Sequence, residues 1–295
     1  MTAKKLKPII TKMVLINLHI SFDAGRRTMN NLSKTIAKDN DADAAMLSTS
    51  IKMIPKDKVA SFTAAVSQAR EFYKKNSLPW EDGNWRVVPV NRLQQFRDDL
   101  DTLISKASDE HQRCYIASYD GLKDAADKKK GKLNVQFPSK KELEESFAIE
   151  YNVGAIASVE DIRIVGIDTA MRKQIQQDTE KRYNQQIEKG LIEQVTNISN
   201  TLEDLVERVG EDDQKGKKYT RAMANFKAML ETTEHLNITG NEALASACKM
   251  AREKITNWSP DAIKSNPEVR SAIKGAAEGV RGALKNVKMN DDEDN

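Results

Sequence analysis

The sequence predicts a mainly α-helical (α+β) protein, in which a small mixed sheet carries long helices and an antiparallel, coiled-coil-like helical arm. Apolar residues recur every three or four positions over most of residues 167–258, as on one face of a helix. Apolar and polar residues largely alternate over Val14–Phe22, which is the period of a strand. Charged residues make up 31% and aromatic residues 5% of the chain, a balance typical of exposed helices with narrow apolar stripes.

The first half of the chain is predicted to alternate between strands and helices. Pro55 is expected at the first turn of a helix, and Asp82-Gly83-Asn84 marks a turn. Ser139 and Glu142 are spaced as a capping box at the start of a short helix. The predicted elements are a strand over Val14–Phe22, a helix over Ala24–Lys38, a strand over Leu47–Ile54, a helix over Pro55–Lys75, a connector over Asn76–Asn84, a strand over Trp85–Val90, a helix over Asn91–Asp127 and a strand over Asp161–Ile167.

Residues 167–258 are predicted to fold as a two-limbed helical arm. A polar break at Gly210–Gly216 reverses the chain, and the apolar rhythm resumes at Tyr219. Folding the limbs about this break sets Asn237–Gly240 opposite Gln186–Lys189, and both stretches are poor in apolar residues. Glycine costs a helix about 1 kcal/mol relative to alanine. We therefore predict a weak joint half-way along the arm, with a break in the returning limb at Asn237–Gly240.

Beyond the arm, Ser259-Pro260 is expected to stop the helix. Further helices are predicted over Asp261–Ser265 and Pro267–Lys285, followed by an acidic tail at Asp291–Asp294. The predicted division is an α+β domain over residues 1–166, the arm over residues 167–258, and C-terminal helices with the tail over residues 259–295.

The charge and the cysteine content limit the partner class and the cellular compartment that the sequence indicates. The net charge of +3 is too small to indicate a polyanion partner by itself. Cys114 and Cys248 both fall in apolar helical stripes, which favours two reduced, packed thiols, and a disulfide between them is the open alternative. No signal peptide or membrane span is apparent, so we expect a cytoplasmic protein.

No motif in the sequence indicates catalysis, a cofactor or a metal. There is no nucleophile elbow, P-loop or dinucleotide fingerprint. The run Asp39–Asp43 begins like a calcium loop, but Ala44 and Ser50 stand where that loop needs glycine and glutamate. The three histidines are far apart, and we expect surface or partly packed positions for His19, His111 and His235. We therefore predict a protein that is not an enzyme.

Two groups of residues are candidates for binding a partner. The connector carries two of the three tryptophans beside a tight turn, which indicates either a plug between sheet and helices or a docking surface with an aromatic anchor. The residues of that surface would be Trp80, Asp82, Trp85 and Arg86. The alternative is nucleic-acid binding, because lysine clusters supply phosphate contacts. That site would use Lys128, Lys129, Lys130 and Lys132 together with Lys215, Lys217 and Lys218 at the arm tip.

The order of elements, with the motifs Leu78–Val90, Phe137-Pro138-Ser139, Ser259-Pro260-Asp261 and Val269-Arg270, resembles a family of bacterial and phage proteins that is classed as a domain of unknown function. Members are often encoded near a MoxR-type AAA+ ATPase and a von Willebrand A-domain protein. The resemblance implies a phage or mobile-element setting and an AAA+ ATPase partner, and it brings no catalytic residues. We expect a non-enzymatic scaffold or adaptor that binds protein partners and associates with copies of itself, with nucleic-acid binding as the rival function.

Overall fold

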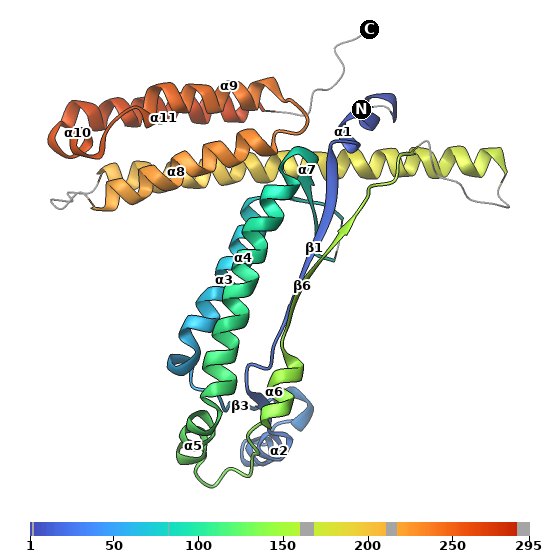
Figure 1. Ribbon diagram of the computed structural model, residues 1–295, viewed down its shortest axis with the longest axis vertical. Coiled ribbons are helices and arrows are strands. Elements are labelled where there is room, and N and C mark those ends of the chain that lie inside the picture. The colour runs from blue at the N-terminus through green and yellow to red at the C-terminus, as the bar shows by residue number, and fades with distance from the viewer. Residues whose placement is uncertain (2, 82, 160–167, 211–216, 288–295) are drawn as a thin grey trace. The chain divides into compact units, whose positions relative to one another are not determined.

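The computed structural model describes residues 1, 3–81, 83–159, 168–210 and 217–287 (Figure 1). The chain is mainly α-helical with small sheets, as predicted. It divides into two compact units: unit 1 is Met1–Asn17, Lys74–Phe96 and Val153–Asn295, and unit 2 is Leu18–Tyr73 and Arg97–Asn152. Both predicted boundaries, after residues 166 and 258, fall inside unit 1, and the division into three segments stays a prediction.

Helices make up most of the described chain. The α-helices are α1 (Ala3–Ile10), α2 (Asn30–Asp39), α3 (Ala60–Lys75), α4 (Leu93–His111), α5 (Tyr119–Lys130), α6 (Lys140–Ser146), α7 (Thr169–Gly210), α8 (Lys217–Leu236), α9 (Glu242–Ala251), α10 (Pro260–Ser265) and α11 (Pro267–Lys285). The strands are β1 (Met13–Ser21), β2 (Arg26–Thr28), β3 (Ser50–Lys52), β4 (Leu78–Pro79), β5 (Trp85–Pro89) and β6 (Ala148–Gly154). Short 3-10 helices are η1 (Ala44–Met46), η2 (Lys56–Val59) and η3 (Val90–Arg92), and π-helices are η4 (Gln112–Ala117) and η6 (Arg252–Thr256).

A four-stranded sheet has the order β4-β5-β1-β6. Strands β1 and β5 are antiparallel, in a register that pairs Met13 with Pro89 and Asn17 with Trp85. The predicted strands Val14–Phe22 and Trp85–Val90 are thus confirmed. Strand β6 was not predicted, and it takes the edge next to β1. The strand predicted at Asp161–Ile167 lies outside the described residues.

Four predictions for the first half of the chain need correction. The strand predicted over Leu47–Ile54 is short, and it pairs with β2 in a separate two-stranded sheet. The helix predicted from Ala24 begins only at Asn30, because Gly25 has a φ of +66° and turns the chain into β2. The helix predicted over Asn91–Asp127 is interrupted by η4 and by Ser118, with φ of −96° and ψ of 13°. The helix predicted over Pro55–Lys75 opens as η2 and continues as α3.

The capping box predicted for α6 is present. Ser139 Oγ accepts a hydrogen bond from the Glu142 backbone N–H at 3.2 Å, and Glu142 Oε2 accepts one from the Ser139 N–H at 2.6 Å. Both contacts satisfy backbone donors that the first turn of a helix leaves unpaired.

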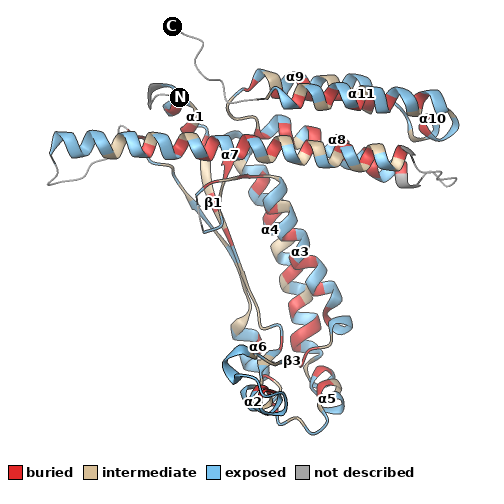
Figure 2. Cartoon of the chain, turned by 180° about the vertical axis from the view of Figure 1, so that it is seen from behind, coloured by how far each residue is buried: buried red, intermediate tan, exposed pale blue. Residues whose placement is uncertain are grey.

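Helices α7, α8, α9 and α11 enclose the main core of unit 1. Figure 1 shows α8 lying along α7, with α9 and α11 together in a second layer. The buried stripes of these helices face one another (Figure 2). The core residues are Leu191, Ile198, Leu202, Leu205, Val209, Tyr219, Ala222, Met223, Phe226, Leu230, Leu244, Ala247, Cys248, Ala251, Ile255, Ile263, Val269, Ile273, Ala277, Val280 and Leu284. The predicted two-limbed arm is present as the hairpin of α7 and α8, but its returning limb turns back after Leu236, and α9 to α11 fold over the hairpin.

The predicted break at Asn237–Gly240 is confirmed, since α8 ends at Leu236 and α9 begins at Glu242. Gly240 has a φ of +66°, in the left-handed region that favours glycine. Asn237 Oδ1 accepts a hydrogen bond from Asn241 N–H at 2.8 Å, and Asn241 Oδ1 caps α9 by accepting from Leu244 N–H at 2.9 Å. Two asparagines and a glycine thus replace helical hydrogen bonds where the chain changes direction.

The two cysteines are buried and unbonded to each other, as the preferred interpretation had it. Cys114 lies in unit 2 and Cys248 in unit 1. Burial raises the pKa of the Cys248 thiol to about 11. Each unit therefore carries one protected thiol that can report its unfolding.

Candidate functional site

Trp80 lies in the interior of unit 1. It is 2% exposed, and its ring lies 5.3 Å from that of Tyr183 on α7. The Trp80 N–H donates to the Trp85 carbonyl at 3.0 Å, which closes the connector turn. Trp85 is half-buried, near Gly154 of β6. The Trp80 side chain thus packs between the sheet and α7. Of the two tryptophans in the connector region, only Trp85 has an exposed part that a partner could contact.

The Arg86 side chain also makes its contacts within unit 1. Its guanidinium forms an ion pair with Glu193 of α7, and the arginine side chain is 12% exposed. Its Nη2 also donates to the carbonyls of Ser77 at 2.6 Å and Lys74 at 3.0 Å, and its Nε donates to Ser77 Oγ at 2.8 Å. Arg86 therefore ties β5 to the end of α3 and to α7. Asp82, the remaining member of the predicted docking surface, lies outside the described residues.

Arg86→Met is expected to lower the free energy of unfolding of unit 1 by about 2 kcal/mol, because Glu193 and two carbonyls then lose their donor. Arg86→Lys keeps the charge but not the planar fork, so an intermediate loss is expected. Urea unfolding, followed by labelling of Cys248, measures both variants. An unchanged midpoint for Arg86→Met would show that this network contributes nothing to folding.

The lysine cluster predicted at residues 128–132 lies at the end of α5 in unit 2. Lys128, Lys129 and Lys132 are exposed, and Lys130 is half-buried with its Nζ 2.6 Å from Asp127 Oδ1. The arm-tip cluster lies apart from it in sequence and belongs to unit 1. There Lys217 and Lys218 open α8, and Lys215 lies outside the described residues. The two clusters therefore belong to different units of the chain.

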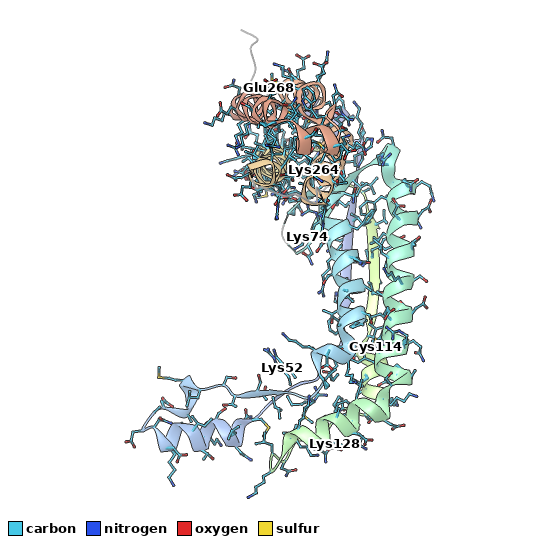
Figure 3. All side chains as sticks on the ribbon, turned by 90° about the vertical axis from the view of Figure 1, so that its left-hand side faces the viewer. Lys52, Lys74, Cys114, Lys128, Lys264 and Glu268 are labelled. Carbon is cyan, nitrogen blue, oxygen red and sulfur yellow. The ribbon has the colours of Figure 1, made fainter. Side chains whose placement is uncertain are left out.

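Unit 2 has a groove between the β3–η2 segment and α5. Its walls are residues 51–57 on one side and Ala126, Lys129 and Lys130 on the other, and its volume is about 340 Å³. We call it the lysine groove, because Lys52 and Lys56 join the two α5 lysines around it. Lys52 and Lys128 are labelled in Figure 3, on the segments that flank the groove. The lysine groove is a concave site whose lining residues all belong to unit 2.

The floor of the lysine groove is apolar. Met53 and Ile54 are 2% and 4% exposed, and Ala126 is 5% exposed. Met53 and Ala126 belong to one small core cluster with Val135. Among the described residues that line the groove, Asp57 is the one acidic side chain. The site thus combines a hydrophobic bottom with a cationic rim.

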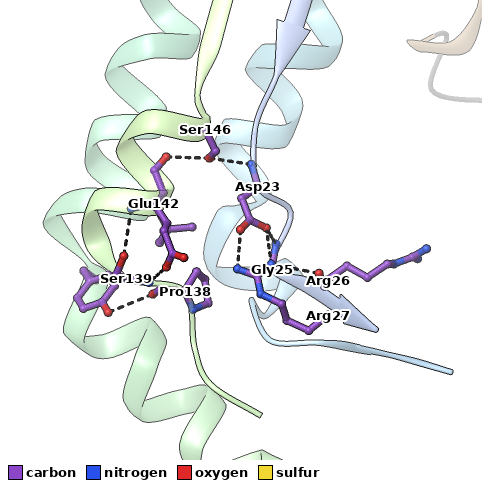
Figure 4. Close-up of polar contacts among 10 residues, drawn as sticks. Asp23, Gly25, Arg26, Arg27, Pro138, Ser139, Glu142 and Ser146 are labelled. Atoms are coloured by element: carbon purple, nitrogen blue, oxygen red, sulfur yellow. Dashed lines mark hydrogen bonds and ion pairs between the residues drawn. The ribbon is translucent and has the colours of Figure 1, made fainter. Parts of the chain in front are cut away.

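A polar turn around Asp23 and Gly25 leads into β2 (Figure 4), the strand that pairs with β3. Asp23 Oδ1 accepts from the Gly25 N–H at 2.7 Å, and Asp23 Oδ2 accepts from Arg27 Nη2 at 2.7 Å. The hydrogen bond from Arg27 lowers the pKa of the Asp23 carboxyl. A Cβ on Gly25 would lie 2.5 Å from Ile54 Cγ1, so glycine lets the turn approach the groove floor. Ser146 Oγ, on α6, accepts from the Asp23 N–H at 3.0 Å.

The sequence pointed to Lys128–Lys132 but missed Lys52 and Lys56. The signal was present in the run Lys52-Met53-Ile54-Pro55-Lys56, where two apolar residues lie between lysines just before a proline. Nothing in the sequence shows that this run lies beside α5, because the contact joins segments that are far apart in the chain.

His111 is buried, whereas the sequence predicted a surface or partly packed position. It is 4% exposed, stacked on Phe147 at 4.1 Å between ring centroids and on Tyr115 at 4.9 Å. Its Nε2 is buried and has no hydrogen-bond partner among the described residues. Burial lowers the pKa of His111 to about 4. His19 and His235 are exposed or partly buried, as expected.

The comparisons with known proteins add no relative: family models, curated proteins and solved structures give no match to this chain. Within the described ranges, no three His, Cys, Asp or Glu side chains lie together as a metal ion would require. In the same ranges no helix is long and apolar enough to cross a membrane.

Proposed function

We propose that this chain is a non-enzymatic adaptor, and that the lysine groove of unit 2 is where it binds a partner macromolecule. The supporting observation is the convergence of Lys52, Lys56, Lys129 and Lys130, from two distant segments, around one apolar-floored hollow. Isolated surface lysines are ordinary solvated residues, whereas a concave site with a few placed polar groups is the usual form of a binding site.

Protein is the partner class that we favour. The groove floor is apolar, and desolvating such a floor contributes to binding when an apolar side chain covers it. By the family resemblance, we further propose an AAA+ ATPase as one partner, association of the chain with copies of itself, and a cytoplasmic setting in a host cell that carries the phage or mobile element.

Nucleic acid is the second candidate, since Lys52, Lys56 and Lys129 could each neutralise a phosphate, while Lys130 is already paired with Asp127. Among the described lining residues, none is an aromatic side chain on which a base could stack. A nucleic-acid partner would thus be held by its backbone, with a strong dependence on salt.

The test is capture from host lysate with three forms of the full chain: wild type, Lys52→Glu with Lys129→Glu, and Lys140→Glu with Lys141→Glu. The last pair is an exposed control on α6, outside the groove lining. We expect wild type and control to retain the same protein after nuclease treatment and the groove variant to lose it by about tenfold or more.

The retained protein, purified and recombined with the three forms, should show the same order of affinity. Equal capture by all three forms would overturn the groove as the binding site. Recovery of nucleic acid alone, lost in the groove variant, would replace the adaptor proposal by the second candidate.

A further inference from the structure

We propose that the lysine groove takes an extended acidic segment of a protein partner, with one apolar side chain of that segment inserted against Met53 and Ile54. The inference rests on the proposed function and adds the chemistry of the ligand.

The shape and lining of the groove favour a peptide with an apolar residue. Its volume of about 340 Å³ could hold roughly ten waters at ~30 Å³ each, which is ample for a large aliphatic side chain. Met53, Ile54 and Ala126 offer no donors from their side chains, so a phosphate pressed into this floor would lose hydration without replacement. An apolar side chain in the same place would release water from both surfaces.

The rim favours carboxylates around that side chain. Lys52, Lys56 and Lys129 are exposed, and none of them forms an ion pair with another described residue. Lys130 is already paired with Asp127, so it contributes less free charge. Three lysines on two sides of a hollow complement acidic residues on either side of an apolar one. Charge of this kind speeds association and fixes orientation, and salt screens it.

The β3 strand also offers backbone groups to an extended ligand. It pairs with β2 alone in the two-stranded sheet. Met53 N–H donates to the Gly25 carbonyl and Met29 N–H to the Thr49 carbonyl. Hydrogen bonding alternates along an antiparallel pair, so the backbone groups of Ser50 and Lys52 point away from β2. Lys52 belongs both to this edge and to the groove, as required for a peptide that adds a strand while its side chains enter the groove.

Fluorescence anisotropy with labelled probes on the full chain tests the inference. The probes are a short peptide of alternating glutamate and valine, a matched peptide of glutamate and serine, the glutamate–valine peptide with N-methylated valines, and a single-stranded oligonucleotide of equal charge. We expect the glutamate–valine peptide to bind about tenfold more tightly than each of the other three.

Lys52→Gln with Lys129→Gln should weaken the glutamate–valine peptide by about tenfold, whereas Lys140→Gln with Lys141→Gln should leave it unchanged. These side chains are exposed, so the variants are expected to fold within about 0.5 kcal/mol of wild type. Circular dichroism and the labelling of Cys114 verify that they do.

The outcomes separate the two proposals. Equal binding of the valine and serine peptides would show that no apolar side chain is inserted in the groove, and would overturn the inference. Tighter binding of the oligonucleotide would overturn it in favour of a ligand with a phosphate backbone. If no probe binds while groove-dependent protein capture persists, the inference fails and the adaptor function stands. If capture is independent of the groove lysines, the proposed function fails as well.

Discussion

Trp80→Ala is expected to lower the free energy of unfolding of unit 1 by about 4 kcal/mol, the usual cost of removing a large ring from a packed interior. The ring is 2% exposed and lies among Leu78, Val87, Tyr183 and Ile187, so the truncation leaves a cavity that these neighbours fill only in part. Trp80→Phe should recover a large share of the loss. The half-buried Trp85 gives the matched control, for which alanine should cost about 1 kcal/mol.

The two cysteines make this measurement specific to one unit. Urea unfolding of unit 1 exposes Cys248, and unfolding of unit 2 exposes Cys114. Trp80→Ala should therefore shift the labelling midpoint of Cys248 while that of Cys114 stays in place. If Trp80→Ala weakened partner binding without shifting the Cys248 midpoint, Trp80 would be a docking anchor and its interior position would be wrong.

Local signals in the sequence were sufficient wherever a few neighbouring residues decide the structure. Ser139 and Glu142 satisfy the first turn of α6 by themselves, which is why spacing alone predicted the cap. The break after Leu236 follows from Asn237, Gly240 and Asn241, all within one short stretch. The period-two pattern of β1 likewise needs only its own residues.

The sequence was insufficient where a residue takes its role from a distant segment. Arg86 resembles an exposed charge in the sequence, but Glu193, more than a hundred residues away, makes it an interior group. The hydrogen-bonding needs of a guanidinium carry no sequence signal of where its acceptors lie. The groove is a similar case, because Lys52 and Lys129 are brought together only when β3 and α5 pack over Met53 and Ala126.

Two features that were missed had a signal in the sequence. Ile149, Tyr151 and Val153 alternate with polar residues in most of β6, so the strand could have been predicted. His111 stands four residues after Ala107 and three before Cys114, which places it on the buried stripe of α4 and η4. Its ionisable side chain argued for the surface, and the aromatic stack overrode that preference.

Unit 2 is expected to lose about 3 kcal/mol of stability in mild acid because of His111. Its pKa is about 4 in the folded chain, owing to burial, against an ordinary value of 6.5. Between these values the unfolded chain binds a proton that the folded chain does not, so the free energy of unfolding falls as pH decreases. This contribution is complete above about pH 6.5, falls between pH 6.5 and 4, and changes no further below pH 4. At about 1.4 kcal/mol per pKa unit, the full loss is about 3 kcal/mol, and that at pH 5 is about 2 kcal/mol.

His111→Phe keeps an aromatic ring beside Phe147 and Tyr115 and removes the titration. Pulse labelling of Cys114 with a disulfide reagent that reacts in acid, referenced to unfolded chain at each pH, measures the stability of unit 2 at pH 7 and pH 5. The stability lost between these pH values should be about 2 kcal/mol smaller in His111→Phe than in wild type. His19→Asn, an exposed histidine in the same unit, should behave as wild type. If wild type and His111→Phe lost the same free energy of unfolding between pH 7 and pH 5, the folded state would accommodate the imidazolium. Any acid sensitivity would then come from the carboxylates, such as Asp23, whose pKa the hydrogen bond from Arg27 lowers.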